Sequence, residues 1–415
     1  MQKQIFDKVK TQYKEHFSEM SLRSVVVDYG VGDNAKSLIE GLDIGKSFLV
    51  VSDFATHEVL GNKIEKAMSG YKIKSVILPN GVEPNKQNVD KVIAEAGHVD
   101  AIIAVGSGTI NDICKYAGYL ENKPYVVFGT APSMNGYSSA NASITIDGHK
   151  KTLKAQLPLA VLLDIDVLVS APERLIRSGL GDSLCRSTAR TDWLLSNLLL
   201  DTYYNEIPFD MLLENEAILL ENSDILMQGD KEIMKILADT LILSGLGMYM
   251  CGGSYPASQG EHMIAHTMEM VFWHKIPATY HGEQIGVTTL TMAKLQEKLL
   301  SSGISAFNNT YDKAEIMGFF GQEIGNQCLD EYQKKANALR NIGNMDDILK
   351  NKWANFVNNA KRNIISCSKI EISLKKAGCA TSCKELGWDD ELYNNAVKYA
   401  KYSRERLTFL DFIKL

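Results

Sequence analysis

The segment AVGSGTINDICKYAG at residues 104–118 is the most informative part of the sequence for the fold. An apolar run ends in Gly106, Ser107 and Gly108, and a segment with helical apolar spacing follows at once. Glycine lets a backbone approach a phosphate closely, and a helix N-terminus offers unpaired N–H groups and the positive end of a dipole. The hydroxyls of Ser107 and Thr109 could add donors. We therefore predict a strand–turn–helix unit that binds a dinucleotide pyrophosphate, although a tight turn can use glycine for steric reasons alone.

Short apolar runs of the same kind surround this stretch and alternate with amphipathic segments. Runs that are rich in β-branched residues and separated by about ten helical residues are typical of a parallel sheet buried on both faces. The expected strands lie at residues 24–30, 47–53, 74–79, 100–108, 124–130 and 160–166. Residues 1–168 are therefore predicted to form an α/β, Rossmann-like nucleotide-binding domain.

The strand pattern ends near residue 169. Segments such as KEIMKILADTLILSGLGMYM (231–250) have helical apolar spacing, and Pro172 suits an early helical position. We predict an all-α domain over residues 169–415, and 415 residues suit two domains. No low-complexity linker separates the two parts, so we expect a ligand in the cleft where the domains meet.

Composition and charge narrow the range of partners. The chain has 44 basic and 50 acidic residues, which gives a net charge of −6 and argues against a nucleic-acid partner. No apolar run approaches the roughly 18–20 residues of a membrane span, and MQKQIFDKVKTQYKEHFSEM (1–20) has no signal-peptide core. Seven scattered cysteines suggest reduced thiols. We expect a cytoplasmic protein without nucleic-acid or membrane partners.

An acidic residue ends one of the predicted strands. Asp53 closes SFLVVSD (47–53), before the glycine turn rather than about 20 residues after it as in the usual dinucleotide fingerprint. At a strand end Asp53 could accept from both ribose hydroxyls and would repel a 2′-phosphate, which favours NAD over NADP. The alternative is that Asp53 caps the following helix.

Histidines cluster in the second half of the chain. His262 and His266 are one helical turn apart in SQGEHMIAHTMEM, and His281 lies in a Tyr-His-Gly turn. Imidazoles at such spacing commonly bind a divalent transition metal, and a carboxylate is expected to complete the set. Asp182 is the best candidate, because it follows Gly179-Leu180-Gly181, where we expect a chain bend at a helix start.

Five blocks in a fixed order now point to one family. The sequence resembles the iron-containing alcohol dehydrogenase, glycerol dehydrogenase and dehydroquinate synthase superfamily, and within it the sn-glycerol-1-phosphate dehydrogenase branch, including bacterial members. The resemblance covers about residues 25–290. The blocks are VGSGTINDICKYAG (105–118), TAPSMNGYSSANASI (130–144), APERLIRSGLGDSLCRSTARTDW (171–193), SYPASQGEHMIAH (254–266) and YHGEQIGVTTL (280–290).

The resemblance implies a set of cofactor contacts and a metal. Asp182, His262 and His281 would hold one divalent ion, expected to be zinc or nickel with iron as an alternative, and His266 would be a proton-handling group near it. Such an ion acts as a Lewis acid, so Asp182 is also counted as catalytic. Thr130 and Ser139 would line the nicotinamide side of the cofactor. The remaining implied cofactor contacts are Gly106, Ser107, Gly108, Thr109 and Asp112.

Two positions depart from that branch. That branch usually has Met-Asp-Gly at residues 134–136, where this chain has Asn135 in the middle position. It usually has Ser-Arg-Pro-Ala-Ser at residues 254–258, where this chain has Tyr255 in place of the arginine. Both positions are expected on the substrate side, together with Lys151. An Arg can hold a phosphate with two hydrogen bonds, whereas Tyr offers a single hydroxyl. We therefore expect a retuned pocket that reduces dihydroxyacetone phosphate poorly and is improved by Asn135→Asp with Tyr255→Arg.

The expected function is an NAD(P)- and metal-dependent dehydrogenase that interconverts a polyol phosphate and its keto form. The substrate is expected to be glycerol 1-phosphate with dihydroxyacetone phosphate or a related sugar-alcohol phosphate, and the protein a homodimer or higher homo-oligomer. A lyase of the dehydroquinate synthase type is an alternative, although only Arg186, Lys151 and Lys154 are candidate cations for its anionic substrate. A third possible function is that of a binding protein that is related to these enzymes but has lost catalytic activity.

Overall fold

The computed structural model describes residues 4–146, 149–304, 311–342 and 345–413. The chain divides into two compact units. The first comprises Met1–Gly179 and Met211–Met250, and the second comprises Leu180–Asp210 and Cys251–Leu415. The division therefore lies later than the expected boundary at residues 168 and 169, and one helical segment returns to the first unit.

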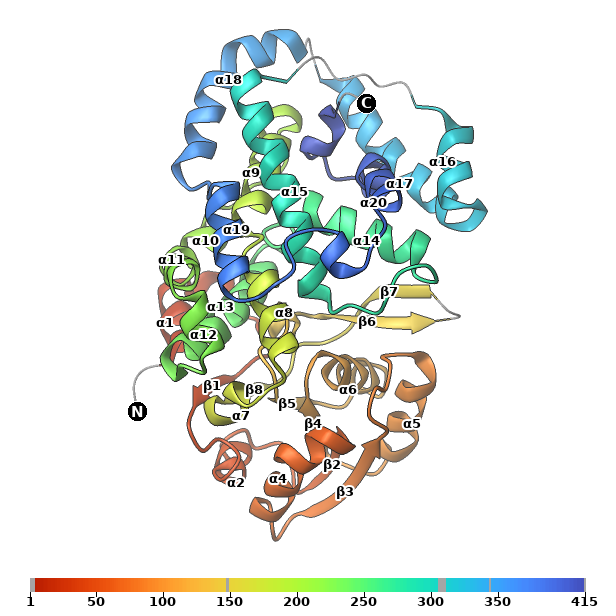
Figure 1. The fold of residues 1–415 in the computed structure, drawn as a ribbon. Coiled ribbons are helices and arrows are strands. Elements are labelled where there is room, and N and C mark those ends of the chain that lie inside the picture. The colour runs from red at the N-terminus through yellow and green to blue at the C-terminus, as the bar shows by residue number, and fades with distance from the viewer. Residues whose placement is uncertain (1–3, 147–148, 305–310, 343–344, 414–415) are drawn as a thin grey trace. The chain divides into compact units, whose positions relative to one another are not determined.

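The first unit is built on a six-stranded sheet in which every adjacent pair of strands is parallel (Figure 1). This confirms the predicted parallel sheet, and each of the six expected runs forms a strand. In spatial order the strands are β1 (Ser24–Asp28), β8 (Ala160–Asp164), β5 (Tyr125–Gly129), β4 (Ala101–Gly106), β2 (Ser47–Asp53) and β3 (Lys72–Leu78).

Helices cover both faces of this sheet. Every residue of β4, β5 and β8 is buried, as expected for central strands, whereas β3 lies at an edge and is largely exposed. Helices α2 (Ala35–Glu40) and α4 (Asn62–Ala67) share one core cluster with alternate strand residues such as Val50 and Ile103. Helices α5 (Lys86–Ala96) and α6 (Gly108–Leu120) pack on β2 and against each other.

Shorter elements complete the chain as far as Ser183. A polar hairpin of β6 (Asn141–Ile146) and β7 (His149–Lys154) precedes β8, and sequence reasoning did not predict it. Helix α8 (Glu173–Ser183) contains the last residues of the first segment of unit one. The other short helical elements are α1 (Ile5–Gln12), η1 (Lys14–His16), α3 (Phe54–Thr56), the π-helical η2 (His57–Gly61), η3 (Asn135–Ser138) and α7 (Ile165–Val169).

Residues 211–250 belong to the first unit because α13 (Lys231–Met250) packs on the turn η3. The two approach so closely that a Cβ on Gly245 would lie 2.0 Å from Ser138 Oγ, and Ser138 Oγ donates to the carbonyl of Ile242. Among the described helices only α13 is long and apolar enough to cross a membrane, and 61% of its most apolar window is buried. That burial is typical of a core helix. Helices α11 (Leu213–Glu221) and α12 (Ser223–Met227) precede it.

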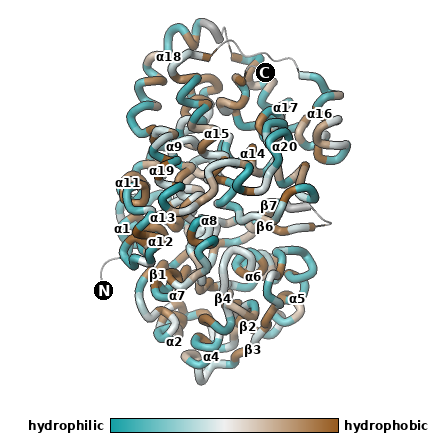
Figure 2. Tube along the Cα trace, in the orientation of Figure 1, coloured by the Kyte–Doolittle hydropathy of each residue, from teal (hydrophilic) through white to brown (hydrophobic). Residues whose placement is uncertain are grey.

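The second unit is built from helices joined by loops, and its described residues form no strand. Helix α18 (Met345–Arg362) shows why such helices pack: hydrophilic and hydrophobic residues alternate along it (Figure 2), and Phe356 and Ala360 bury one face in the core. The helices are α9 (Arg186–Leu200), α10 (Ile207–Asp210), α14 (Gly260–Phe272), α15 (His281–Ser302), α16 (Lys313–Phe320), α17 (Gln322–Asn341), α18 (Met345–Arg362), α19 (Cys367–Lys376) and α20 (Asp390–Tyr399), with 3₁₀ turns η4 (Lys384–Leu386), η5 (Ala400–Tyr402) and η6 (Phe409–Phe412).

Candidate nucleotide-binding edge and metal centre

The sheet order puts a topological switch point at the carboxyl ends of β2 and β4. From β2 the chain moves outward to β3, whereas from β4 it moves the opposite way to β5, so the connections diverge at this point. In open parallel sheets ligands bind at such a switch point. Asp53 ends β2 and Gly106 ends β4, and the register pairs Val51 with Ala104. The structure thus brings Asp53 and the glycine turn to neighbouring strand ends.

The glycine turn opens directly into a helix. Gly108 is the first residue of α6, and Ser107, Gly108 and Thr109 are partly exposed. A Cβ on Gly106 would lie 2.6 Å from Ile110 Cβ, so Gly106 is needed for packing of the turn itself. A Cβ on Gly108 would meet only the side chain of Met134, at 3.4 Å. Gly108 is therefore the glycine that best fits a role in close ligand approach.

Asp53 caps helix α3 in this structure, which was the alternative to a ribose-binding role in the sequence analysis. Its Oδ1 accepts from the backbone N–H of Thr56 at 2.8 Å and from the Thr56 hydroxyl at 2.9 Å. Its Oδ2 accepts no hydrogen bond from the described residues. Capping and ribose binding are thus compatible, because each can use a different oxygen.

The other expected cofactor residues hold the loop after β5. Asp112 Oδ2 accepts from the Ser143 N–H at 3.0 Å, so this carboxylate fastens the β6–β7 hairpin. The backbone N–H of Thr130 donates to the carbonyl of Gly106. The hydroxyl of Ser139 donates to the carbonyl of Gly136. Buried Lys115 ties these segments together by donating to the carbonyls of Gly136 at 2.7 Å and Asn141 at 2.9 Å. Burial lowers the pKa of Lys115, and Asp112 opposes that effect.

Two of the expected substrate residues also lie in the first unit. Asn135 begins η3 and its Nδ2 donates to Ser244 Oγ of α13 at 3.2 Å. Lys151 is exposed on β7, where it pairs in register with Ile144.

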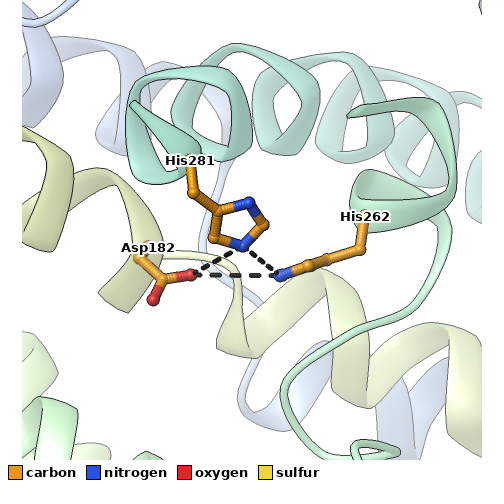
Figure 3. Close-up of side chains that lie close together, drawn as sticks. All are labelled: Asp182, His262 and His281. Atoms are coloured by element: carbon orange, nitrogen blue, oxygen red, sulfur yellow. Dashed lines mark hydrogen bonds and ion pairs between the residues drawn. The ribbon is translucent and has the colours of Figure 1, made fainter. Parts of the chain in front are cut away.

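Three side chains of the second unit converge on one point (Figure 3). Nε2 of His281 lies 3.3 Å from Nε2 of His262. Asp182 Oδ1 lies 3.9 Å from Nε2 of His262 and 3.8 Å from Nε2 of His281. Ligands about 2.1 Å from a tetrahedral ion are separated by about 3.4 Å, so this spacing suits a divalent metal. Two imidazole nitrogens and a carboxylate oxygen also form a donor set that suits zinc and other divalent transition metals.

Glycines bring Asp182 beside His281, but not through the expected bend. Asp182 lies near the end of the continuous helix α8, and His281 is the first residue of α15. A Cβ on Gly181 would lie 2.1 Å from the carbonyl oxygen of Gly282, and one on Gly179 would lie 1.6 Å from that of Pro132. The expectation of a turn at a helix start was therefore wrong. The glycines are helical, and they permit close approach of neighbouring backbone.

Glu261 orients the first histidine, and sequence reasoning missed it. Its buried Oε1 lies 3.0 Å from Nδ1 of His262, so the Nδ1 side of the ring faces this carboxylate and Nε2 faces Asp182 and His281. Burial would raise the pKa of Glu261, but hydrogen bonding and charge from His262 outweigh it and the pKa is lowered. Cys185 Sγ forms a second close group with Glu261 and His262, and it donates to the carbonyls of Asp182 and Ala257.

His266 lies beside the three converging side chains. Its ring centroid is 5.8 Å from that of His281 and 6.0 Å from that of His262. Burial lowers the pKa of His266 to about 4, with Glu269 opposing that effect and the charge of Arg404 adding to it. His266 is therefore a neutral imidazole at neutral pH.

Tyr255 lies in the loop before α14, four residues from the cap of the histidine helix. Its ring stacks on Trp193 with centroids 5.6 Å apart. The guanidinium of Arg406 also lies over this ring, with its Cζ 4.3 Å from the Tyr255 centroid. Tyr255, one of the two positions that depart from the related branch, thus carries an arginine from another segment on its ring.

Comparison with known sequences finds one family of relatives. A family model described as iron-containing alcohol dehydrogenase matches residues 26–172. A glycerol-1-phosphate dehydrogenase (NAD(P)+) of Sulfurisphaera tokodaii is 34% identical over 284 residues, which is 68% of this chain and 79% of that protein. The glycerol-1-phosphate dehydrogenase (NAD(P)+) of Bacillus subtilis is 30% identical over 269 residues, covering 63% of this chain and 68% of that protein.

Solved structures share the fold at low sequence identity. Glycerol dehydrogenase from Schizosaccharomyces pombe has a TM-score of 0.56 and 19% identity, with 93% of each chain covered. Sulfoacetaldehyde reductase from Bifidobacterium kashiwanohense in complex with NAD+ has a TM-score of 0.60 and 13% identity, covering 94% of this chain and 96% of the other.

Proposed function

Because the chain belongs to the iron-containing alcohol dehydrogenase family, in its glycerol-1-phosphate dehydrogenase branch, we propose that it is an NAD(P)- and metal-dependent polyol-phosphate dehydrogenase. The observation that carries the proposal is the convergence of Asp182, His262 and His281 within ion-binding distance. The substrate pair we propose is glycerol 1-phosphate and dihydroxyacetone phosphate. A cytoplasmic homo-oligomer is part of the same proposal.

The metal would be held by Nε2 of both histidines and by Asp182 Oδ1. A divalent ion at this position supplies Lewis acidity toward the oxygen on the reacting carbon. The chain contributes by fixing the donors: Glu261 sets the tautomer of His262, and the contact between Gly181 and Gly282 sets the spacing of α8 and α15.

The dinucleotide would lie on the carboxyl edge of the sheet, where NAD(P) supplies or accepts hydride. The N-terminus of α6 would bind its pyrophosphate through the backbone of Ser107, Gly108 and Thr109. The second oxygen of Asp53 would accept from a ribose hydroxyl and would disfavour a 2′-phosphate. Alcohol oxidation also releases a proton, and neutral His266 is the base we assign to it.

A rate assay with matched substrates tests this proposal. The protein is stripped of metal, reloaded separately with Zn²⁺, Ni²⁺ or Fe²⁺, and mixed with NADH or NADPH and dihydroxyacetone phosphate. We expect a metal-dependent loss of nicotinamide absorbance with the phosphorylated ketone and much slower loss with dihydroxyacetone. A lyase of the dehydroquinate synthase type would show no net turnover of NADH, and an inactive homologue would bind cofactor without turnover. Either result would refute the dehydrogenase.

A further inference from the structure

We propose that Arg404 and Arg406, from the segment after α20, bind the phosphate group of the substrate. The inference rests on the proposed function in so far as it assumes a phosphorylated substrate. The two arginines lie far along the sequence from the histidine helix, in a region to which no role is otherwise assigned. Their geometry brings them to the loop at residues 254–258.

Both guanidinium groups contact this loop. Arg404 Nη1 donates to Ser258 Oγ at 2.9 Å. Arg406 donates through Nη2 to Ser254 Oγ at 3.1 Å and through Nη1 to the Ser258 carbonyl. An arginine carries five N–H donors. The described residues accept one bond from Arg404 and two from Arg406, and the buried Nε of Arg406 has no partner among them.

Neither arginine forms a close ion pair with a described carboxylate, although Glu261 and Glu405 lie near enough for their charges to act on both guanidinium groups. No described Asp or Glu lies within 4.0 Å of either guanidinium, whereas Arg190 in the same unit pairs with Glu206 at 2.6 Å. Burial lowers the pKa of Arg406 to about 10, and the charge of Arg404 adds to this effect. Two like charges with spare donors in a partly buried place suit a phosphate dianion, which arginine binds through paired hydrogen bonds.

A dedicated scaffold holds the arginine segment in place. Nζ of fully buried Lys335 on α17 donates to the carbonyls of Lys401 at 2.6 Å and Arg406 at 3.2 Å. The same Nζ pairs with Asp411 Oδ1 at 2.7 Å. Because burying this ion pair is costly, its use here implies that the position of the segment matters.

Asp192 links the segment to the metal-binding helix. Its Oδ1 accepts from the N–H of Phe409 at 3.0 Å, and its Oδ2 accepts from the N–H of Gly260 at 3.0 Å. Gly260 begins α14, two residues before His262. The segment just after the arginines and the histidine helix are therefore bound to the same carboxylate.

The arginine pair also explains the departure at position 255. Arg406 places a guanidinium over the Tyr255 ring, at the position where the resemblance implies an arginine in the related branch. Phosphorylated substrates should then be accepted by the wild-type protein, contrary to the expectation from Tyr255 alone.

Phosphate binding tests the site independently of catalysis. Inorganic phosphate is titrated calorimetrically into metal-loaded wild-type protein and into Arg404→Gln, Arg406→Gln and Arg340→Gln, the last an exposed arginine of α17 with the same charge change. We expect at least tenfold weaker binding for the first two variants and wild-type affinity for the control. Equal affinity in all four proteins would overturn the site, even if the dehydrogenase activity is present.

Kinetics separates phosphate binding from general damage. In both arginine variants the KM for dihydroxyacetone phosphate should rise at least tenfold, whereas kcat/KM for dihydroxyacetone and the KM for NADH should change less than twofold. Arg406→Lys should retain part of the affinity, and Tyr255→Arg should restore part of it to Arg406→Gln. Parallel losses with both ketones would indicate a structural role and refute the proposal. If the wild type reduces no ketone, the proposed function fails while the phosphate titration still decides the site.

Discussion

Nε2 of His262 and Nε2 of His281 face each other at 3.3 Å, although they belong to different helices. Since the Glu261 carboxylate accepts from Nδ1 of His262, Nε2 of that ring is directed at Asp182 and His281. Two ring nitrogens and a carboxylate oxygen so close together need a proton or a cation between them. A divalent metal satisfies all three groups at once.

Removing one ligand should therefore remove the metal. His262→Ala is expected to lower metal content to below one tenth of the wild-type value and to abolish ketone reduction, while the circular dichroism spectrum is retained. His98→Ala, an exposed histidine of the first unit, is the control and should retain both. Metal content measured by atomic emission decides the point, and a fully loaded His262→Ala protein would exclude this residue as a ligand.

The orienting role of Glu261 gives a graded prediction. Glu261→Gln keeps the size of the side chain but weakens its hold on the Nδ1 proton, so metal affinity should fall by about 10–100-fold, the range typical of outer partners of metal ligands. Competition with a chelator measures this affinity. Glu283→Gln, a capping residue of α15, provides the comparison. An unchanged metal affinity in Glu261→Gln would show that Glu261 acts only in packing.

Close helix approach at Gly181 predicts a sensitive position. Gly181→Ala would place a methyl group 2.1 Å from the Gly282 carbonyl oxygen and should destabilise the protein by about 1–3 kcal/mol while also lowering metal affinity. Gly318→Ala, in α16 with nothing within 4 Å, should instead stabilise by about 0.5–1 kcal/mol. Denaturant unfolding of the two variants should give shifts of opposite sign, and a neutral Gly181→Ala would contradict the tight contact.

The sheet could be predicted from the sequence, because its central strands are buried on both faces and their apolar runs are continuous. The β6–β7 hairpin escaped prediction, since HKKTLK (149–154) is polar and lacks that signal. Residues 211–250 have the periodicity of any core helix, and nothing local reveals that Gly245 lets α13 pack on η3.

At the candidate site the residue types could be predicted but not all of their surroundings. Clustered histidines identified His262 and His281, whereas Gly179 and Gly181 suggested a turn because a close helix contact requires the same residue. Arg404 and Arg406 have no motif. Their role depends on Lys335 and Asp192, which fix a distant segment against the loop before α14.

Cofactor preference should depend on one charge. Asp53→Asn keeps the cap of α3, because Asn caps helices as well as Asp, but removes the charge that would repel a 2′-phosphate. The ratio of kcat/KM for NADPH to that for NADH should rise about tenfold, equivalent to roughly 1.4 kcal/mol. Asp43→Asn, at an exposed position, is the control. A wild-type enzyme that already prefers NADPH would remove Asp53 from the ribose site.

Stability of the first unit should depend on pH through Asp239 of α13. Burial raises the pKa of Asp239 to about 6, although Lys235, with Nζ 3.5 Å from Oδ2, opposes that effect. Because the folded pKa exceeds the unfolded value of about 3.9, the protonated form stabilises the fold, and this contribution is lost as pH rises from about 4 to about 6. The change amounts to about 2–3 kcal/mol at most.

Asp239→Asn should remove this dependence. Its free energy of unfolding should vary less than that of the wild type over the same pH interval, and above pH 6 the variant should be the more stable protein, since a neutral amide avoids burial of charge. Asp330→Asn, at an exposed position of α17, should leave the wild-type profile intact. Urea unfolding at half-unit pH steps measures the profiles. If Asp239→Asn and wild type lose stability in parallel as pH rises, another group governs the dependence, and the carboxyl of Asp239 is ionised at lower pH than its burial implies.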